Sequence, residues 1–135
     1  MTPEKLAPEQ TISRWFIDLA WYEQNNRSFL NLAQQGLCAK CVEKLGKKKK
    51  KYTQNDVINT IKDCCSKSPE FITGKMPLLE SIFRVILANG NEPIDIEEIG
   101  KQLTEYRGDA YSVSTQTLTR LLDNDRWYGF KSIKG

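Results

Sequence analysis

Histidine is absent from the 135 residues of this chain, and its absence excludes several kinds of catalytic and metal site. Histidine is the usual proton shuttle near neutral pH, and it completes the Ser-His and Cys-His pairs of nucleophilic enzymes. Without it, a site for a soft metal ion must be built from cysteine. The sequence also has no glycine-rich phosphate-binding loop and no distinctive carboxylate pair. We therefore expect a protein that is not an enzyme and has no evident small-molecule substrate.

Long hydrophobic runs are missing as well. The longest, residues 76–88, is interrupted by Glu80, Ser81 and Arg84, whereas a membrane helix needs about 18 apolar residues in succession. The start of the chain has no apolar segment behind a basic one, as a signal peptide would. These absences predict a cytoplasmic protein that does not contact a membrane.

The chain has enough apolar residues to fold, and its charges are unevenly distributed. Hydrophobic residues make up 39% and charged residues 27%, and the net charge is only +3. Residues 92–109 are mainly acidic, whereas residues 40–51 contain seven lysines and one acid. Five lysines stand in a row, and because like charges repel, we expect a solvated loop there that attracts a polyanion such as nucleic acid: Lys47, Lys48, Lys49, Lys50 and Lys51.

Apolar residues in the first half recur at helical spacing. Three helices are predicted, over residues 8–25, 27–35 and 53–65. Thr53 and Asp56 have the spacing of a reciprocal cap at the start of the third. The first of these helices carries an aromatic apolar face made of Ile12, Trp15, Phe16, Leu19 and Tyr22.

All four cysteines of the chain occur within this first half. Cys38 and Cys41 form a C-x2-C pair, and Cys64 and Cys65 follow as neighbours. A C-x2-C turn suits a tetrahedral zinc ion, and nearby lysines favour the thiolate that binds it. Adjacent helical residues point about 100° apart, so Cys64 and Cys65 can reach one ion only if their helix ends there. The pattern predicts a closed structural zinc site with four thiolates.

Other interpretations of the cysteines remain open. Cys64 and Cys65 fall at helical spacing from Val57, Ile58 and Ile61, so they can also be small core residues. A disulfide or redox pair fits a reducing compartment less well. An iron–sulfur cluster is a variant of the metal hypothesis. The lysine loop between the pairs favours a metal, because something must hold the ends of that loop together.

In the second half, residues 76–133, the predicted order is helix, short strand, helix, helix, strand. Pro77 opens the first helix and Asp95 caps the second. Ser112 or Ser114 caps the third. Two segments indicate this order of elements: Pro93-Ile-Asp-Ile-Glu-Glu-Ile99-Gly-Lys-Gln-Leu103 and Val113-Ser-Thr-Gln-Thr-Leu118. In this order of elements, the segment resembles winged-helix domains.

The resemblance implies a surface for nucleic acid. In many winged-helix proteins the third helix enters the DNA major groove, and here that helix is residues 114–123. Gln116 and Arg120 are its candidate base-reading side chains, although they also suit an ordinary solvated face. Only one extended segment, residues 126–133, follows the helix, so the expected wing is truncated.

Three aromatic residues near the end of the chain allow two interpretations. Trp127, Tyr128 and Phe130 can stack on single-stranded nucleic acid, or they can close a small core. Core closure is the favoured interpretation.

The sequence therefore predicts a mainly α protein. A helical unit with the cysteine cluster and the lysine-rich loop, residues 1–73, precedes a winged-helix-like domain with a short β element, residues 76–135. The predicted function is a non-enzymatic binding module, a nucleic-acid-associated zinc protein of the transcription-regulator kind. The alternative is a protein-docking adaptor or oligomeric scaffold that binds a protein partner and no nucleic acid.

Overall fold

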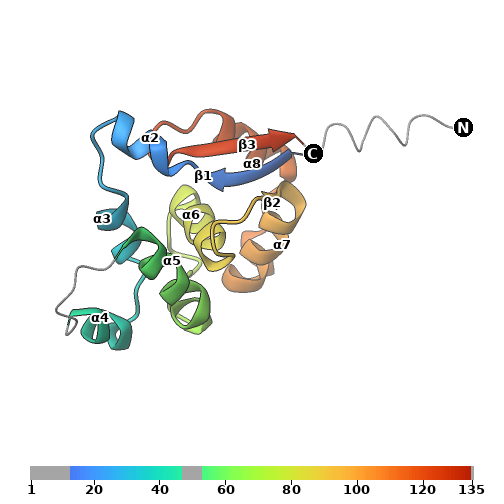
Figure 1. Cartoon of the computed structure of the whole chain (residues 1–135). Helices are drawn as coiled ribbons and strands as arrows, with labels where there is room; N and C mark the ends of the chain where they lie inside the picture. The colour runs from blue at the N-terminus through green and yellow to red at the C-terminus, as the bar shows by residue number, and fades with distance from the viewer. Residues whose placement is uncertain (1–12, 47–52, 135) are drawn as a thin grey trace, which may run out of the picture.

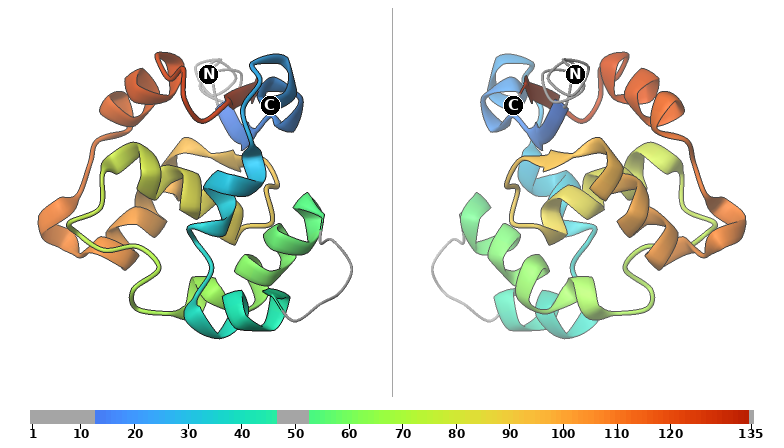
Figure 2. Two further views of the ribbon diagram at one scale, coloured as in Figure 1. Left: turned by 90° about the vertical axis from the view of Figure 1, so that its left-hand side faces the viewer. Right: turned by 90° about the vertical axis from the view of Figure 1, so that its right-hand side faces the viewer.

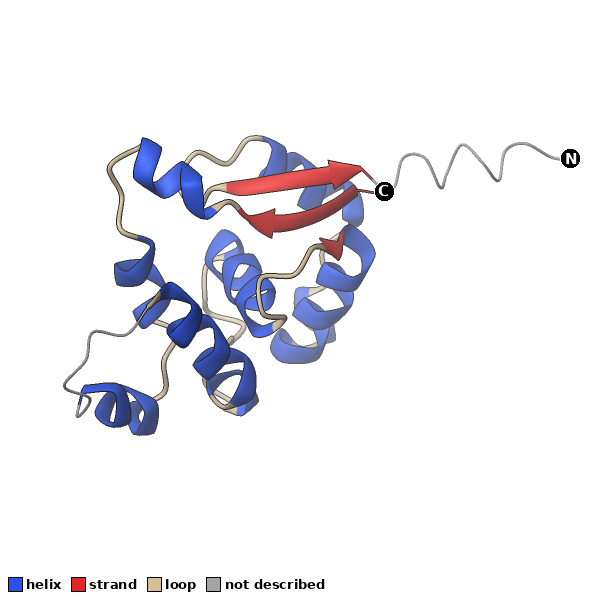
Figure 3. Cartoon of the chain, viewed as in Figure 1, coloured by secondary structure: helices blue, strands red, loops and turns tan. Residues whose placement is uncertain are grey.

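The computed structural model describes residues 13–46 and 53–134, so the lysine tract at 47–51 lies outside the described residues. The described chain is mainly helical and contains a three-stranded antiparallel sheet (Figures 1 and 3). The sheet lies at one end of the molecule, and α4 and α5 lie at the other (Figure 2). The mainly α class predicted from the sequence is confirmed.

The described part of the chain begins with a strand where a helix was expected. β1 spans Ser13–Ile17, and α2, Leu19–Gln24, follows after Asp18. The prediction of one helix over residues 8–25 is therefore wrong from residue 13 to 18. Trp15 and Ile17 are buried whereas Arg14 is exposed, which is the alternation of a strand with one face in the core.

β1 is the central strand of the sheet. The strand order is β2-β1-β3, with β2 at Ile94–Asp95 and β3 at Phe130–Lys134. β1 pairs with β3 over five residue pairs, from Ser13↔Lys134 to Ile17↔Phe130. The extended segment expected at residues 126–133 begins only at residue 130, and it has a partner strand from the start of the chain that the sequence did not suggest.

The helices of the first half surround the cysteines. They are α3 (Phe29–Gln34), α4 (Ala39–Gly46) and α5 (Gln54–Asp63), followed by the short 3-10 helix η2 (Cys65–Lys67). The predicted reciprocal cap of α5 is confirmed, because Thr53 and Asp56 each accept a hydrogen bond from the other's backbone amide, at 2.8 and 3.1 Å. α4 is a helix where only a cysteine turn was expected.

The second half has the predicted order of elements. α6 spans Leu78–Ala88, α7 Ile96–Arg107 and α8 Thr115–Asp123, with the 3-10 helix η3 (Asp109–Tyr111) between the last two. Asp95 caps α7 and Ser114 caps α8. β2 lies between α6 and α7 and β3 follows α8, so the order helix, strand, helix, helix, strand is confirmed.

One hydrophobic core connects the two halves of the sequence. It extends from Trp15 of β1 through Ile61 of α5 and Ile86 of α6 to Leu122 of α8. A polar contact reinforces it: the Asn91 side chain accepts a hydrogen bond from the Ile17 amide at 2.7 Å and donates one to the Ile17 carbonyl at 2.9 Å. β1 thus belongs to the sheet of the second half, across the sequence position at which two domains were expected to meet. Within the described residues, no helix is both long enough and apolar enough to cross a membrane.

Candidate metal centre

The two cysteine pairs lie at helix ends. Cys38 precedes α4, and its carbonyl accepts hydrogen bonds from the amides of Cys41 and Val42 at 3.0 and 2.9 Å. α5 ends at Asp63, with Cys64 as its C-terminal cap and Cys65 as the first residue of η2. This break in the helix meets the condition that adjacent cysteines must satisfy to reach one point, since the backbone no longer holds them at helical spacing.

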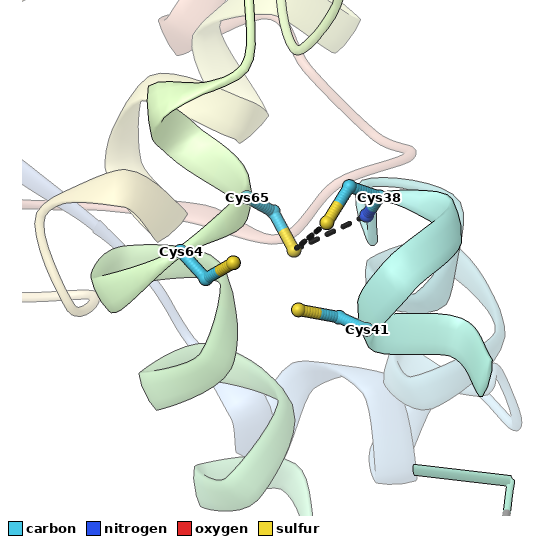
Figure 4. Close-up of side chains that lie close together, drawn as sticks. All are labelled: Cys38, Cys41, Cys64 and Cys65. Carbon is cyan, nitrogen blue, oxygen red and sulfur yellow. Dashed lines mark hydrogen bonds between the residues drawn. The ribbon is translucent and has the colours of Figure 1, made fainter. Parts of the chain in front are cut away.

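The four sulfur atoms converge. Figure 4 shows Cys38 and Cys41 on one side and Cys64 and Cys65 on the other, with their side chains directed toward one another. The Sγ atoms lie 3.4–4.1 Å apart. Four thiolates at the corners of a zinc tetrahedron are about 3.8 Å apart, because each Zn–S bond is about 2.3 Å long. The arrangement can bind a single metal ion without large movement of the backbone.

Backbone amides stabilise negative charge on the sulfurs. The Cys38 amide donates a hydrogen bond to Sγ of Cys65 at 3.1 Å, and the two Sγ atoms of this pair are 3.5 Å apart. At the start of α4, the backbone amide of Cys41 lowers the pKa of the Cys38 thiol to about 7. A helix N-terminus favours thiolate over thiol for this reason.

Burial acts in the opposite direction on the two inner cysteines. Cys41 and Cys65 are 3% and 1% exposed, whereas Cys38 and Cys64 are half-buried. Burial raises the pKa of the Cys41 and Cys65 thiols, because a thiolate is poorly stabilised away from water. All four cysteines are free. If all four were buried as thiolates they would need a cation at their centre, and a divalent metal ion can supply that charge.

The part of α4 whose burial is described, residues 39–44, contacts the interior through this cluster. From residue 39 to 44, Cys41 is the one buried side chain, and Val42 is 51% exposed. A helix that buries so little apolar surface gains little from the hydrophobic effect. Over residues 39–44, the contact between Cys41 and the cysteines after α5 is therefore the main buried attachment of α4.

The structure brings together the four candidate metal ligands that the sequence suggested. Cys65 is a buried core residue, but it also belongs to a group of four sulfurs, which packing alone does not require. The candidate nucleic-acid residues of α8, Gln116 and Arg120, are both exposed and line an open groove of about 660 Å³ with Thr115, Thr119, Asp123, Asn124 and Ile96. The lysines at 47–51 lie outside the described residues and continue from the end of α4.

Two arginines with structural contacts were missed by sequence reasoning. Arg84 of α6 donates hydrogen bonds to the carbonyls of Phe71 and Gln35, at 2.8 and 3.0 Å, and so ties α6 to the chain on both sides of the cysteine cluster. A single cation in a mainly apolar helix, four residues after Glu80, is the signal that could have identified it. Arg27 lies over the rings of Trp21 and Trp127, and no spacing in the sequence links these three residues.

The aromatic residues near the C-terminus divide between the two interpretations. Tyr128 and Phe130 pack against the core, as favoured. Trp127 is 64% exposed, so core closure is wrong for this residue.

Comparison with known proteins adds no relative. No family model, no curated protein and no solved structure matches this chain. Its functional interpretation therefore depends on the geometry of its own residues.

Proposed function

We propose that the four cysteines bind one zinc ion in a closed structural site, within a non-enzymatic module that associates with nucleic acid. The observation that carries the metal proposal is the convergence of four sulfurs, 3.4–4.1 Å apart, drawn from two helix ends that are distant in the sequence. Four protein ligands leave no open position for water or substrate on zinc. The ion would hold α4 and α5 together and would not take part in a reaction.

The donor set and its spacing favour zinc over an iron–sulfur cluster. In a cluster of several irons the cysteines bind different iron atoms, which spreads the sulfurs more widely than around one ion. Here all four Sγ atoms lie within 4.8 Å of one another. The amide of Cys38, which donates to Sγ of Cys65, supplies a hydrogen bond from outside the ligand set of the kind that orients metal ligands.

Elemental analysis tests the metal proposal. Protein purified without added metal should contain about one zinc per chain. Its four thiols should become reactive toward a thiol reagent after a chelator is added, without any reductant. Cys38→Ser and Cys64→Ser replace the two half-buried ligands and should reduce the zinc content. Ser66→Ala is the matched control, because its hydroxyl donates to the Lys62 carbonyl, outside the cluster. Protein with no metal, or thiols released only by reductant, would overturn the proposal.

The nucleic-acid proposal is supported by α8 and its surroundings. Gln116 and Arg120 are exposed side by side on one groove, and both can donate hydrogen bonds to base edges. Asp123 also lines this groove and opposes a phosphate there. Lys40 and Lys44 are exposed on α4, which leads into the lysine tract. Attraction to phosphate would come mainly from these lysines, and sequence reading from α8.

β1 supports a winged-helix arrangement assembled from both ends of the chain. A wing hairpin needs two antiparallel strands, and the second half of the sequence supplies only β3. β1 pairs antiparallel with β3 along its whole length and with β2 on its other side. We propose that β1 takes the place of the missing wing strand. Ser13 and Lys134, which pair with each other, would then lie where a hairpin loop would otherwise join the two strands.

Binding to a labelled DNA duplex tests this part of the proposal. The wild-type protein should increase the anisotropy of the duplex at low salt, and the affinity should fall steeply as salt rises. Replacing the five lysines from Lys47 to Lys51 by serine should weaken binding and flatten the salt dependence. Gln116→Ala with Arg120→Ala should weaken binding by roughly tenfold or more.

Controls separate this function from its alternative. Lys62→Ser and Lys101→Ser replace exposed lysines outside the tract and should change binding little. A wild-type protein that binds neither DNA nor RNA at low salt, but copurifies with a protein, would be a docking adaptor, and the nucleic-acid proposal would be wrong.

A further inference from the structure

Trp127 is the most exposed of the large hydrophobic side chains that the described part of the chain contains. It is 64% exposed, compared with 51% for Val42 and 46% for Tyr111. An indole left in water forgoes a large hydrophobic gain. An exposed tryptophan therefore needs another explanation than packing within this chain.

The turn that carries Trp127 is firmly held. The Asp125 carboxylate accepts hydrogen bonds from the amides of Trp127 and Tyr128, at 3.0–3.2 Å. The Tyr128 carbonyl accepts from the Tyr22 hydroxyl at 2.7 Å, and the Gly129 carbonyl accepts from the Asp18 amide at 2.8 Å. The indole is thus presented on a backbone that is already ordered, so a ligand would not have to order this turn on binding.

Arg27 lies against both indoles of this region. Its guanidinium carbon is 5.3 Å from the ring centroid of Trp127 and 5.7 Å from that of Trp21, within the range of cation–π attraction. Among the described residues, no carboxylate forms an ion pair with the Arg27 guanidinium. Its planar N–H donors are available to an anionic group, which guanidinium binds well.

Gly129 explains why Trp21 can approach this turn. Gly129 has a φ of +67°, and a Cβ there would lie 2.9 Å from the Trp21 ring. The small residue lets the α2 indole pack directly on the backbone behind Trp127. The cluster Trp21, Arg27 and Trp127, which we call the indole–guanidinium cluster, therefore joins α2 to the turn between α8 and β3.

The charges around the cluster suit a polyanion. Arg126 and Lys131 are exposed on the same segment as Trp127. Asp125 is the acid in this turn, and its carboxylate is already bound by two backbone amides. Glu23 is exposed on α2, so the segment after α8 is the more basic side.

We propose that the indole–guanidinium cluster is a binding site for single-stranded nucleic acid. A base would stack on the exposed surface of the Trp127 indole, and the adjacent phosphate would accept hydrogen bonds from Arg27. Base–aromatic stacking combined with a cationic backbone contact is the general chemistry of single-strand recognition, and it requires no particular base. This site goes beyond the proposed function, because none of its three residues lines the α8 groove.

Titration of a labelled single-stranded oligothymidine tests the site. The full-length protein should bind it with quenching of tryptophan fluorescence, and Trp127→Ala should weaken binding roughly tenfold, the effect expected from one lost stacking contact. Trp127→Phe should retain part of the affinity. Arg27→Lys keeps the positive charge but removes the planar guanidinium, so it should also weaken binding.

Tyr111→Ala is the matched control, because Tyr111 is an exposed aromatic residue outside the cluster. It should leave single-strand binding unchanged, and a thermal melt should show that Trp127→Ala is folded. Trp127→Ala should not alter duplex binding, whereas Gln116→Ala with Arg120→Ala should alter only duplex binding. A wild-type protein that binds the oligothymidine but no duplex therefore refutes the α8 proposal and not this one. The inference is overturned if the wild-type protein does not bind the oligothymidine, or if Trp127→Ala binds it equally well. It is also overturned if Trp127 is needed for binding a protein partner and the protein does not bind the single strand.

Discussion

Two helices of similar length, α4 and α6, are held in the protein by different means. α6 buries six side chains, Ser81, Ile82, Phe83, Val85, Ile86 and Leu87. α4 buries one, Cys41, over residues 39–44. α6 is therefore held by apolar burial, whereas the one buried contact of α4 over residues 39–44 is made by a cysteine.

This difference shows how a basic segment can be kept at a defined place. Lys40 and Lys44 are exposed on α4. A larger apolar face on so short a helix would leave fewer positions for exposed lysines. A metal ion stabilises a structure through a few ligands and needs little buried area. The comparison predicts that the two regions respond differently to metal removal and to core mutations.

Metal removal should produce the largest effect, and it should be confined at first to α4 and the cysteine segments. Structural zinc contributes about 10–16 kcal/mol of binding free energy in zinc-finger peptides at neutral pH. Hydrogen exchange with and without a chelator measures the effect. Amides of residues 39–44 should lose protection, while those of α6 should keep it. Equal loss in both helices would show that α4 is not held by the metal alone.

Ile86→Ala should have the next largest effect, and it should destabilise the apolar core without removing the metal. Ile86 is fully buried in α6, and its truncation should lower the free energy of unfolding by about 2–5 kcal/mol. Urea unfolding measures the loss, and the zinc content of the folded variant should stay at one per chain. Val42→Ala, on the exposed side of α4, is the matched control and should cost little. Loss of zinc in Ile86→Ala would contradict the division between the two regions.

Asn91→Ala should have an intermediate effect on the free energy of unfolding. The variant loses both hydrogen bonds between the Asn91 side chain and the backbone of Ile17. The unfolding free energy should fall by about 1–3 kcal/mol, because a partly buried amide and carbonyl are left without partners. Chemical denaturation measures the change, with exposed Asn55→Ala as control. An unchanged stability would mean that water replaces Asn91 without cost.

Substitutions that remove helix caps should have the smallest effects on stability, and they should distinguish the cysteine region from the second half of the protein. Thr53→Ala removes the cap of α5, and Ser114→Ala removes the cap of α8. Each should cost about 1 kcal/mol in the metal-loaded protein. After chelation, the cost of Thr53→Ala should shrink if the cysteine region has already opened, whereas that of Ser114→Ala should not. Thermal melts of both variants, with and without chelator, would show this, and parallel behaviour would contradict it.

Much of the candidate site could be predicted from the sequence, because the information is local. Cys38 and Cys41 are close in any turn, and the residues from Ser66 to Pro69 mark the end of a helix at the second pair. The helix caps at Thr53, Asp95 and Ser114 follow from the same kind of short-range chemistry.

The central strand could not be predicted in this way. Trp15, Phe16 and Leu19 fit helical spacing, and Phe16 is apolar although its strand neighbours on the same side are polar, which hides the alternation. The pairing partners of β1, β2 and β3, both lie in the second half of the sequence, and no local pattern indicates these pairings. Likewise, the contact of Arg27 with Trp127 depends on the sheet that brings α2 beside the turn before β3.

The central position of β1 has a consequence for synthesis on the ribosome. β1 is among the first described segments to leave the exit tunnel, yet β3, its partner along five residue pairs, is the last. Until β3 has been synthesised, Trp15 and Ile17 have no complete sheet in which to bury their side chains. Pairings between such distant segments form slowly, because the intervening loop must be closed first. The three-stranded sheet can therefore be completed only after β3 has been released, and chaperones that bind exposed apolar segments would find a target in β1 until then.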